Sequence, residues 1–226
     1  MKIKNVLTYI FCLGLIPLII ILCAVFWGKG SYPFVSAAVA VLAGVPFFLT
    51  FEREKNTRKI VLLAVMVALS VAGRFIFAPV QFFKPVAAIV ILAGMYFGSQ
   101  FGFLTGALSA VISDFYFGQG PWTPFQMFSW GLIGFLAGVL SNSLIKSKIV
   151  LIIYGAFSGV LFSLIMDIWT VLSLDGGDFN FNRFLAAVTT ALPVIGIYVV
   201  SNIIFLLILS PLFGKKIERL KTKYGI

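Results

Sequence analysis

The sequence predicts an all-α membrane protein, in which a two-helix transmembrane hairpin precedes a six-helix bundle. Hydrophobic residues make up 61% of the chain and charged residues only 11%, and the mean hydropathy is +1.11. Apolar runs recur along the chain, and most approach the roughly 20 residues that a helix needs to cross the hydrocarbon core. Short turns rich in polar residues, Gly or Pro separate these runs. This composition is typical of a polytopic membrane protein and not of a soluble domain.

The hairpin is predicted from the first two apolar runs, residues 5–26 and 33–51. A short turn with interfacial aromatic residues joins them. The polar stretch 52–59 follows and looks like a boundary, so we divide the chain into a hairpin, 1–55, and a bundle, 56–226. The first run lacks a small-residue cleavage site and is interpreted as an anchor. Its two cysteines, Cys12 and Cys23, are predicted to be packing residues.

Six further apolar segments should form the bundle. They cover residues 60–77, 85–97, 101–117, 124–140, 149–174 and 184–212. The second is short enough to be tilted or extended by its loop, and the last carries Pro193, which should kink it. Glycines recur at four-residue spacing, which lets helix backbones approach closely within one subunit. They are Gly94, Gly98, Gly102 and Gly106, with the pairs Gly134/Gly138 and Gly155/Gly159.

The basic residues predict the orientation in the membrane. With an inner N-terminus and eight crossings, both termini are cytoplasmic, and the inner segments hold most of the 17 Lys and Arg residues. Those on the inner side are Lys2, Lys4, Arg53, Lys55, Arg58, Lys59, Lys146, Lys148, Lys215, Lys216, Arg219, Lys221 and Lys223. The predicted outer side keeps Lys29, Arg74, Lys84 and Arg183. The positive-inside rule supports this topology, and the inner charge is suited to anionic lipid of a bacterial cell membrane, with no nucleic-acid partner expected.

Three charged residues lie inside predicted spans: Arg74, Asp114 and Asp167. Arg74 lies roughly 22 Å along a helix beyond the charged boundary at Lys59, which places it in the outer third of the membrane. Charged groups at this depth are costly and usually pair or line a cavity. Other polar and aromatic residues fall near the same level, and the full set of predicted substrate contacts is Arg74, Lys84, Asp114, Gln119, Trp122, Gln126, Trp130, Asp167 and Trp169. The pattern favours a pocket that opens outward over a closed apolar floor.

The turn between the third and fourth bundle helices is the centre of this site. Residues 118–124 contain two glycines and two prolines, which forbid a continuous helix, and Pro124 suits the first turn of the next one. Gln119, Trp122 and Gln126 should then contact a ligand, with Arg74 and Asp114 below them as a supporting ion pair. Two alternatives stay open at this point. The ion pair could be purely structural, and the aromatic residues could be only a membrane-interface belt.

Enzyme chemistry is not indicated. The chain has no His, no nucleotide-binding Gly-rich loop and no clustered acids for a metal, so we predict no catalytic residue, no metal and no cofactor. The pair Asp175 and Asp178 lacks the spacing of a calcium loop and is interpreted as a solvated turn. An ion channel is disfavoured too, since the inner half of the bundle offers no polar path.

Residues 56–226 resemble the substrate-binding membrane subunit, or S-component, of energy-coupling factor (ECF) vitamin transporters. The matching motifs lie at residues 64–68, 73–74, 83–87, 102–110 and 117–127, and the last is the most specific. The resemblance implies a six-helix bundle that captures a vitamin and docks on a scaffold membrane subunit driven by two cytoplasmic ATPases. It also implies that Ala64 and Ala68, with Ala72 continuing the row, contact that scaffold. The motif at 117–127 is similar to the branch proposed to carry cobalamin.

The hairpin departs from the minimal fold of that family, which puts the docking geometry on its side in doubt. A second class therefore stays open, a structural membrane scaffold of the rod-shape MreD type with a similar bundle and no small-molecule ligand. The polar and aromatic cluster discriminates between the two classes, because a scaffold protein does not need it.

Overall fold

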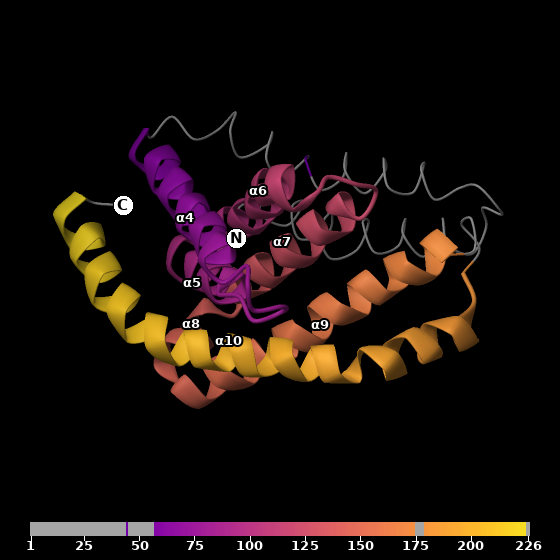
Figure 1. Cartoon of the computed structure of the whole chain (residues 1–226). Helices are drawn as coiled ribbons and strands as arrows, with labels where there is room; N and C mark the ends of the chain where they lie inside the picture. The colour runs from indigo at the N-terminus through magenta and orange to yellow at the C-terminus, as the bar shows by residue number, and fades with distance from the viewer. Residues whose placement is uncertain (1–43, 45–56, 175–178, 225–226) are drawn as a thin grey trace, which may run out of the picture.

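The computed structural model describes Gly44 and residues 57–174 and 179–224, so the predicted hairpin 1–55 lies outside the described residues apart from Gly44. Every regular element in the ranges 57–174 and 179–224 is a helix (Figure 1). The helices are α4 Thr57–Ile76, α5 Val86–Phe97, α6 Ser99–Phe117, α7 Thr123–Val139, α8 Ser141–Lys146, α9 Lys148–Leu174 and α10 Phe181–Tyr224. The prediction of an all-α fold is therefore confirmed.

All six predicted bundle segments are helical, and two details differ from the sequence prediction. The predicted inner loop between the fourth and fifth segments contains a short helix, α8. The last helix, α10, extends from Phe181 to Tyr224, beyond the predicted end at residue 212, and includes both Pro193 and Pro211. It is a continuous, curved ribbon in Figure 1 and is not broken at either proline. A proline removes one backbone hydrogen bond without ending a helix when neighbouring packing supports it.

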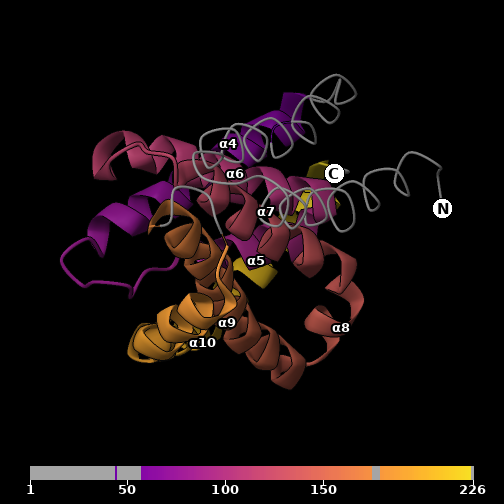
Figure 2. The ribbon, with the colours of Figure 1, turned by 90° about the vertical axis from the view of Figure 1, so that its right-hand side faces the viewer.

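Helix α5 occupies the centre of the bundle. It packs against each of the other helices in the described part of the chain, and Figure 2 shows it surrounded by them. Its residues from Val86 to Met95 are all buried, because apolar and small side chains occupy every face of the helix. A helix that is hydrophobic all round belongs in a protein interior. This explains why the shortest predicted span is not a lipid-facing one.

Glycines set the spacing between α6 and α7, which pack extensively against each other. A Cβ atom added to Gly102 would lie 2.3 Å from the backbone oxygen of Gly134, and one added to Gly134 would lie 2.2 Å from the oxygen of Gly102. Only glycine permits this backbone-to-backbone approach. The predicted packing role of the glycine row within one subunit is confirmed at these positions.

The outer surface of the bundle suits a lipid environment. Within the described residues, three helices are long and apolar enough to cross a membrane, over Arg58–Ile76, Lys148–Leu174 and Phe181–Ile217, and α5 is a shorter apolar helix. Large apolar side chains are exposed on each of these three helices. Such an exposed apolar surface is expected where lipid replaces water as the solvent.

Candidate functional site

A buried ion pair joins α4 to α6. Arg74 is in the last turn of α4, and its Nη1 atom lies 2.7 Å from Oδ1 of Asp114, near the end of α6. Arg74 is 8% exposed and Asp114 is 1% exposed. The Nη1 group of Arg74 also donates to the hydroxyl of Ser113. The ion pair expected from the sequence is therefore present, at the end of the bundle that the charge pattern predicts to face outward.

Asp114 has two further neighbours, both from α7. The hydroxyl of Thr123 donates to Oδ2 of Asp114 at 3.1 Å. When the amide of Gln126 is turned so that its nitrogen faces the carboxylate, that nitrogen donates to Oδ2 at 2.7 Å. We call this set of five residues, Arg74, Ser113, Asp114, Thr123 and Gln126, the Arg74 cluster. Since each charge in it has a partner, the cluster is a buried polar floor whose charges are satisfied.

The turn 118–122 brings Thr123 close to the carboxylate of Asp114. Gly118 ends α6 with a φ of 109°, a conformation that residues with a Cβ rarely adopt. The backbone nitrogen of Thr123 donates to the oxygen of Gly120 at 2.9 Å, and the nitrogen of Gly120 donates to the Thr123 hydroxyl at 3.3 Å. Pro124 sits in the first turn of α7, as predicted. The glycines and the proline therefore place Thr123, the first residue of α7, within hydrogen-bond distance of Asp114 near the end of α6.

Two cations meet one aromatic ring at this end of the bundle. The guanidinium carbon of Arg74 lies 4.6 Å from the ring centroid of Phe117 and 5.1 Å from that of Trp130. The ammonium nitrogen of Lys84 lies 4.7 Å from the Phe117 centroid. Contacts of this length are favourable cation–π interactions. Burial, and after it the charge of Arg74, lowers the pKa of Lys84 below its usual 10.5.

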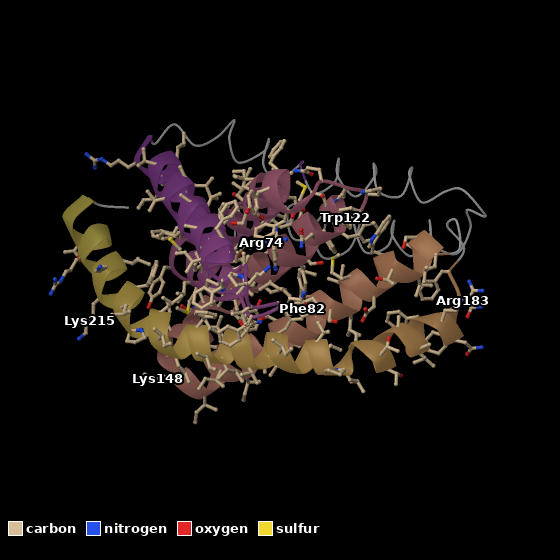
Figure 3. The ribbon with its side chains drawn as sticks, in the orientation of Figure 1. Arg74, Phe82, Trp122, Lys148, Arg183 and Lys215 are labelled. Atoms are coloured by element: carbon tan, nitrogen blue, oxygen red, sulfur yellow. The ribbon has the colours of Figure 1, made fainter. Side chains whose placement is uncertain are left out.

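Four aromatic side chains form a continuous row that begins at Trp130. Trp130 and Phe162 stack with centroids 5.3 Å apart and an angle of 15° between their planes. Phe162 meets Tyr198 edge-on at 5.1 Å, and Tyr198 meets Phe82 edge-on at 5.7 Å. We call Phe82, Trp130, Phe162 and Tyr198 the aromatic row. It joins α7, α9, α10 and the loop between α4 and α5, and Figure 3 labels Phe82 of this row together with Arg74.

The hydroxyl of Ser201 hydrogen-bonds the loop 77–85 to α10. Ser201 accepts a hydrogen bond from the backbone nitrogen of Lys84 at 3.0 Å and donates to the backbone oxygen of the same residue at 3.1 Å. Phe82, two residues earlier, has a φ of 61°, which is unusual for a bulky residue. The two hydrogen bonds of Ser201 therefore hold Lys84, and with it Phe82, at the same end of the bundle as the Arg74 cluster.

Asp167 is the second buried aspartate, on α9. It is 8% exposed, and Ser163, one turn earlier, is its polar neighbour. Within the ranges 57–174 and 179–224, its Oδ2 atom has no hydrogen-bond partner. Tyr198 of the aromatic row lies within range of the charges of both Arg74 and Asp167. Asp167 thus lies near the row without belonging to the Arg74 cluster.

The structure brings some of the predicted contact residues together and leaves others apart. Arg74, Lys84, Asp114, Gln126 and Trp130 are linked through the contacts above. The amide of Gln126 points at Asp114, so it serves the ion pair in this ligand-free structure.

Three predicted residues lie away from these contacts. Gln119 is exposed and donates back to the Val111 backbone oxygen of α6 at 2.8 Å. Trp122 is 39% exposed and covers Gly120 in the turn. Trp169 packs 5.3 Å from Phe125 inside the core. Their roles in ligand contact stay predictions.

Several residues of the site were not identified from the sequence. Ser113 directly precedes Asp114 in the sequence, and Thr123 lies in the turn 118–124, so hydroxyls close to a predicted buried acid were an available signal. Phe162, Tyr198 and Ser201 belong to long apolar segments, where nothing in the local pattern distinguishes a site residue from a core residue. Only the packing of α9 and α10 against the other helices reveals them.

The family model described as "ECF-type riboflavin transporter, S component" matches residues 54–219, well over half of the chain. No solved structure matches the chain. The match supports a substrate-binding subunit of a vitamin-uptake transporter, in a family of transporter subunits and not of enzymes, and it does not favour the MreD-type alternative. With its apolar helices and its buried polar site, the chain is a multi-pass membrane protein that belongs to the ECF-type riboflavin transporter S-component family.

Proposed function

We propose that this chain captures a flat, ring-containing vitamin of the flavin class above the Arg74 cluster and delivers it to an ECF scaffold subunit and two cytoplasmic ATPases. The single observation that carries the choice of ligand class is the aromatic row beside a fully paired polar floor. A planar ligand gains both buried area and favourable ring contacts from such side chains. The printed family name, riboflavin transporter, agrees with this class.

The charges of the site agree with a neutral ring system. Arg74 and Asp114 already neutralise each other, so the floor offers no uncompensated charge to a strongly ionic ligand. Lys84 and Asp167 add one charge of each sign at the same end of the bundle. A ligand with a flat apolar body and a few hydrogen-bonding groups fits this arrangement, as small-molecule sites generally combine apolar walls with few polar contacts.

Cobalamin is the second candidate ligand, because the motif at residues 117–127 is similar to the branch proposed to carry it. In the structure this motif supplies the turn, Phe117, and the two α7 partners of Asp114. Those contacts support a role in positioning the ion pair. They do not distinguish between the two vitamins, and the experiment below therefore includes both.

Docking on the scaffold is supported by the exposed face of α4. Ala64, Ala68 and Ala72 are all exposed, whereas Met66, Val67 and Val71 on the other side of the helix are buried in the bundle. A row of small residues permits close approach of a second helix. Larger apolar residues flank it, with Val61, Val65 and Leu69 also exposed. The row is thus available to a partner helix in the membrane.

The test is ligand binding by the purified, detergent-solubilised protein. Riboflavin and cobalamin are titrated separately, and any compound that copurifies is identified by its absorption spectrum and mass. We expect saturable riboflavin binding with quenched flavin fluorescence, and a loss of at least tenfold in affinity for Trp130→Leu, because stacking is lost. Phe115→Leu is the matched control, since Phe115 lies on α6 and is 80% exposed. Binding of cobalamin alone would refute the flavin class, and binding of neither vitamin would refute capture of both.

A further inference from the structure

Two aspartates of this protein are both buried, but their hydrogen-bonding needs are met to very different degrees. Asp114 is 1% exposed and has partners from Arg74, Thr123 and Gln126. Asp167 is 8% exposed, and its Oδ2 atom has no hydrogen-bond partner. Burying a carboxylate oxygen without a partner is costly, and such groups are rare in native structures. A feature of this kind calls for a partner that the described residues do not supply.

No described side chain is placed to be that partner. The ammonium group of Lys84 lies over the Phe117 ring, and Arg74 is already paired with Asp114. Ser163 is the polar neighbour of Asp167, but Oδ2 is left without a bond. Among the described residues, no group of three or more His, Cys, Asp or Glu could hold a metal ion. The unsatisfied oxygen is therefore not part of a metal centre in that part of the chain.

The position of Asp167 connects it with the aromatic row. It lies on the same helix as Phe162, α9, five residues further along, and Phe162 stacks on Trp130. Tyr198, which meets Phe162 edge-on, lies within range of the Asp167 charge. A ring system held by the aromatic row would thus have a buried hydrogen-bond acceptor beside it.

We propose that Oδ2 of Asp167 accepts a hydrogen bond from an N–H or O–H group of the captured ligand and thereby determines its specificity. This inference rests on the proposed function. It adds that the ligand must carry a hydrogen-bond donor on the side that faces Asp167 of α9. A flavin offers donors of two kinds, the imide N–H of its ring and the hydroxyls of its ribityl chain. A site built around a buried acceptor strongly rejects analogues that lack the donor, because the acceptor is then left unpaired.

The first experiment needs no ligand and compares the two aspartates by thermal unfolding of the purified protein. Asp167→Asn removes a charge whose polar neighbour is the neutral Ser163 and whose Oδ2 atom has no partner among the described residues, so the Tm of the ligand-free variant should equal or exceed that of the wild type. Asp114→Asn removes a charge that has several partners, and its Tm should fall. A fall in Tm for Asp167→Asn comparable to that for Asp114→Asn would overturn the inference, because it would show that the protein itself satisfies the carboxylate.

The second experiment measures riboflavin binding to the wild type and to Asp167→Asn. Hydrogen bonds to charged groups are the stronger ones, so we expect the affinity of the variant to fall at least tenfold. The same titrations with 3-methylriboflavin and with lumiflavin separate the two donors. The analogue that lacks the relevant donor should bind the wild type weakly and should lose little more on Asp167→Asn.

The outcomes separate this inference from the proposed function. If the wild type binds riboflavin and Asp167→Asn binds it equally well, the flavin proposal stands and the role of Asp167 is refuted. If both analogues lose as much affinity as riboflavin does on Asp167→Asn, neither donor contacts the carboxylate and the inference is also refuted. If the wild type does not bind riboflavin, the flavin proposal itself fails, and the donor that it assigns to Asp167 fails with it.

Discussion

Breaking the Arg74–Asp114 pair from one side should be more harmful than removing both charges. Asp114→Leu leaves the guanidinium of Arg74 at 8% exposure with no carboxylate, since its remaining polar contact is the hydroxyl of Ser113. Removing one partner of a buried pair typically costs about 3–5 kcal/mol, because an uncompensated charge stays buried. In a chain of this size, that corresponds to a Tm lower by roughly 6–20 °C.

The double variant Arg74→Met, Asp114→Leu removes both charges and keeps most of the side-chain volume. Replacement of a buried pair by apolar residues is often close to neutral. Here Thr123 and Gln126 would each lose an acceptor, at about 1–3 kcal/mol for each group left unsatisfied. Both losses occur in the single variant as well, so the double variant should unfold at a higher temperature than Asp114→Leu.

The assay is thermal unfolding of the detergent-solubilised proteins, followed by a size-exclusion check that each variant is monodisperse before heating. A double-mutant cycle compares the wild type with Asp114→Leu, Arg74→Met and the double variant. It gives the coupling free energy between positions 74 and 114. A double variant that is less stable than Asp114→Leu would refute the reasoning. It would mean that the contacts of Arg74 with Ser113, Phe117 and Trp130 outweigh the cost of leaving its charge unpaired.

Four further outcomes are expected. Trp122→Ala should weaken vitamin binding about tenfold or more with unchanged expression, measured by calorimetry; wild-type affinity would identify the turn as an interface anchor only. Ala68→Trp should abolish uptake by the complete transporter while the isolated subunit still binds its vitamin, and a joint loss would contradict docking at this row. In a cysteine-free background, Asn180→Cys should react with an impermeant reagent from outside and Lys148→Cys should not; external labelling of the latter would reverse the topology. The pKa of Lys84 is lowered in the folded state from 10.5, so the folded protein binds fewer protons than the unfolded chain between the lowered pKa and 10.5. The contribution of Lys84 to the stability of the wild type should therefore rise with pH between the lowered pKa and 10.5. The gain in Tm from Lys84→Met should be largest at pH values below the lowered pKa and should vanish above pH 10.5. A gain in Tm that grows with pH would contradict this prediction.

The sequence was sufficient for the six bundle helices, although it did not predict the short helix α8. Continuous apolar runs between polar turns defined all six bundle helices, because a helix in lipid must satisfy its own backbone and expose apolar side chains. The pairing of Arg74 with Asp114 could also be anticipated, since two opposite charges at one membrane depth are strongly favoured to meet. The start of α7 near Pro124 followed from local turn chemistry alone.

The tertiary structure decided which side chains share the site. The ligand contact of Gln126 stays a prediction, and in the ligand-free structure its amide reaches Asp114, where α7 packs against α6. Phe162 and Tyr198 come from helices whose apolar pattern gives every face the same appearance, so only their rotation in the bundle places them against Trp130.

The two buried aspartates also show what the sequence determines and what only the tertiary structure determines. From the sequence, Asp114 and Asp167 are alike, each a lone acid in an apolar segment at similar depth. In the structure one has partners from α4 and α7, and the other has an oxygen with none. Local sequence determines where along a helix a charge lies, because hydrophobicity and helical rise are local properties. Its partners come from other helices, and these are set by packing between segments far apart in the chain, which only the assembled bundle reveals.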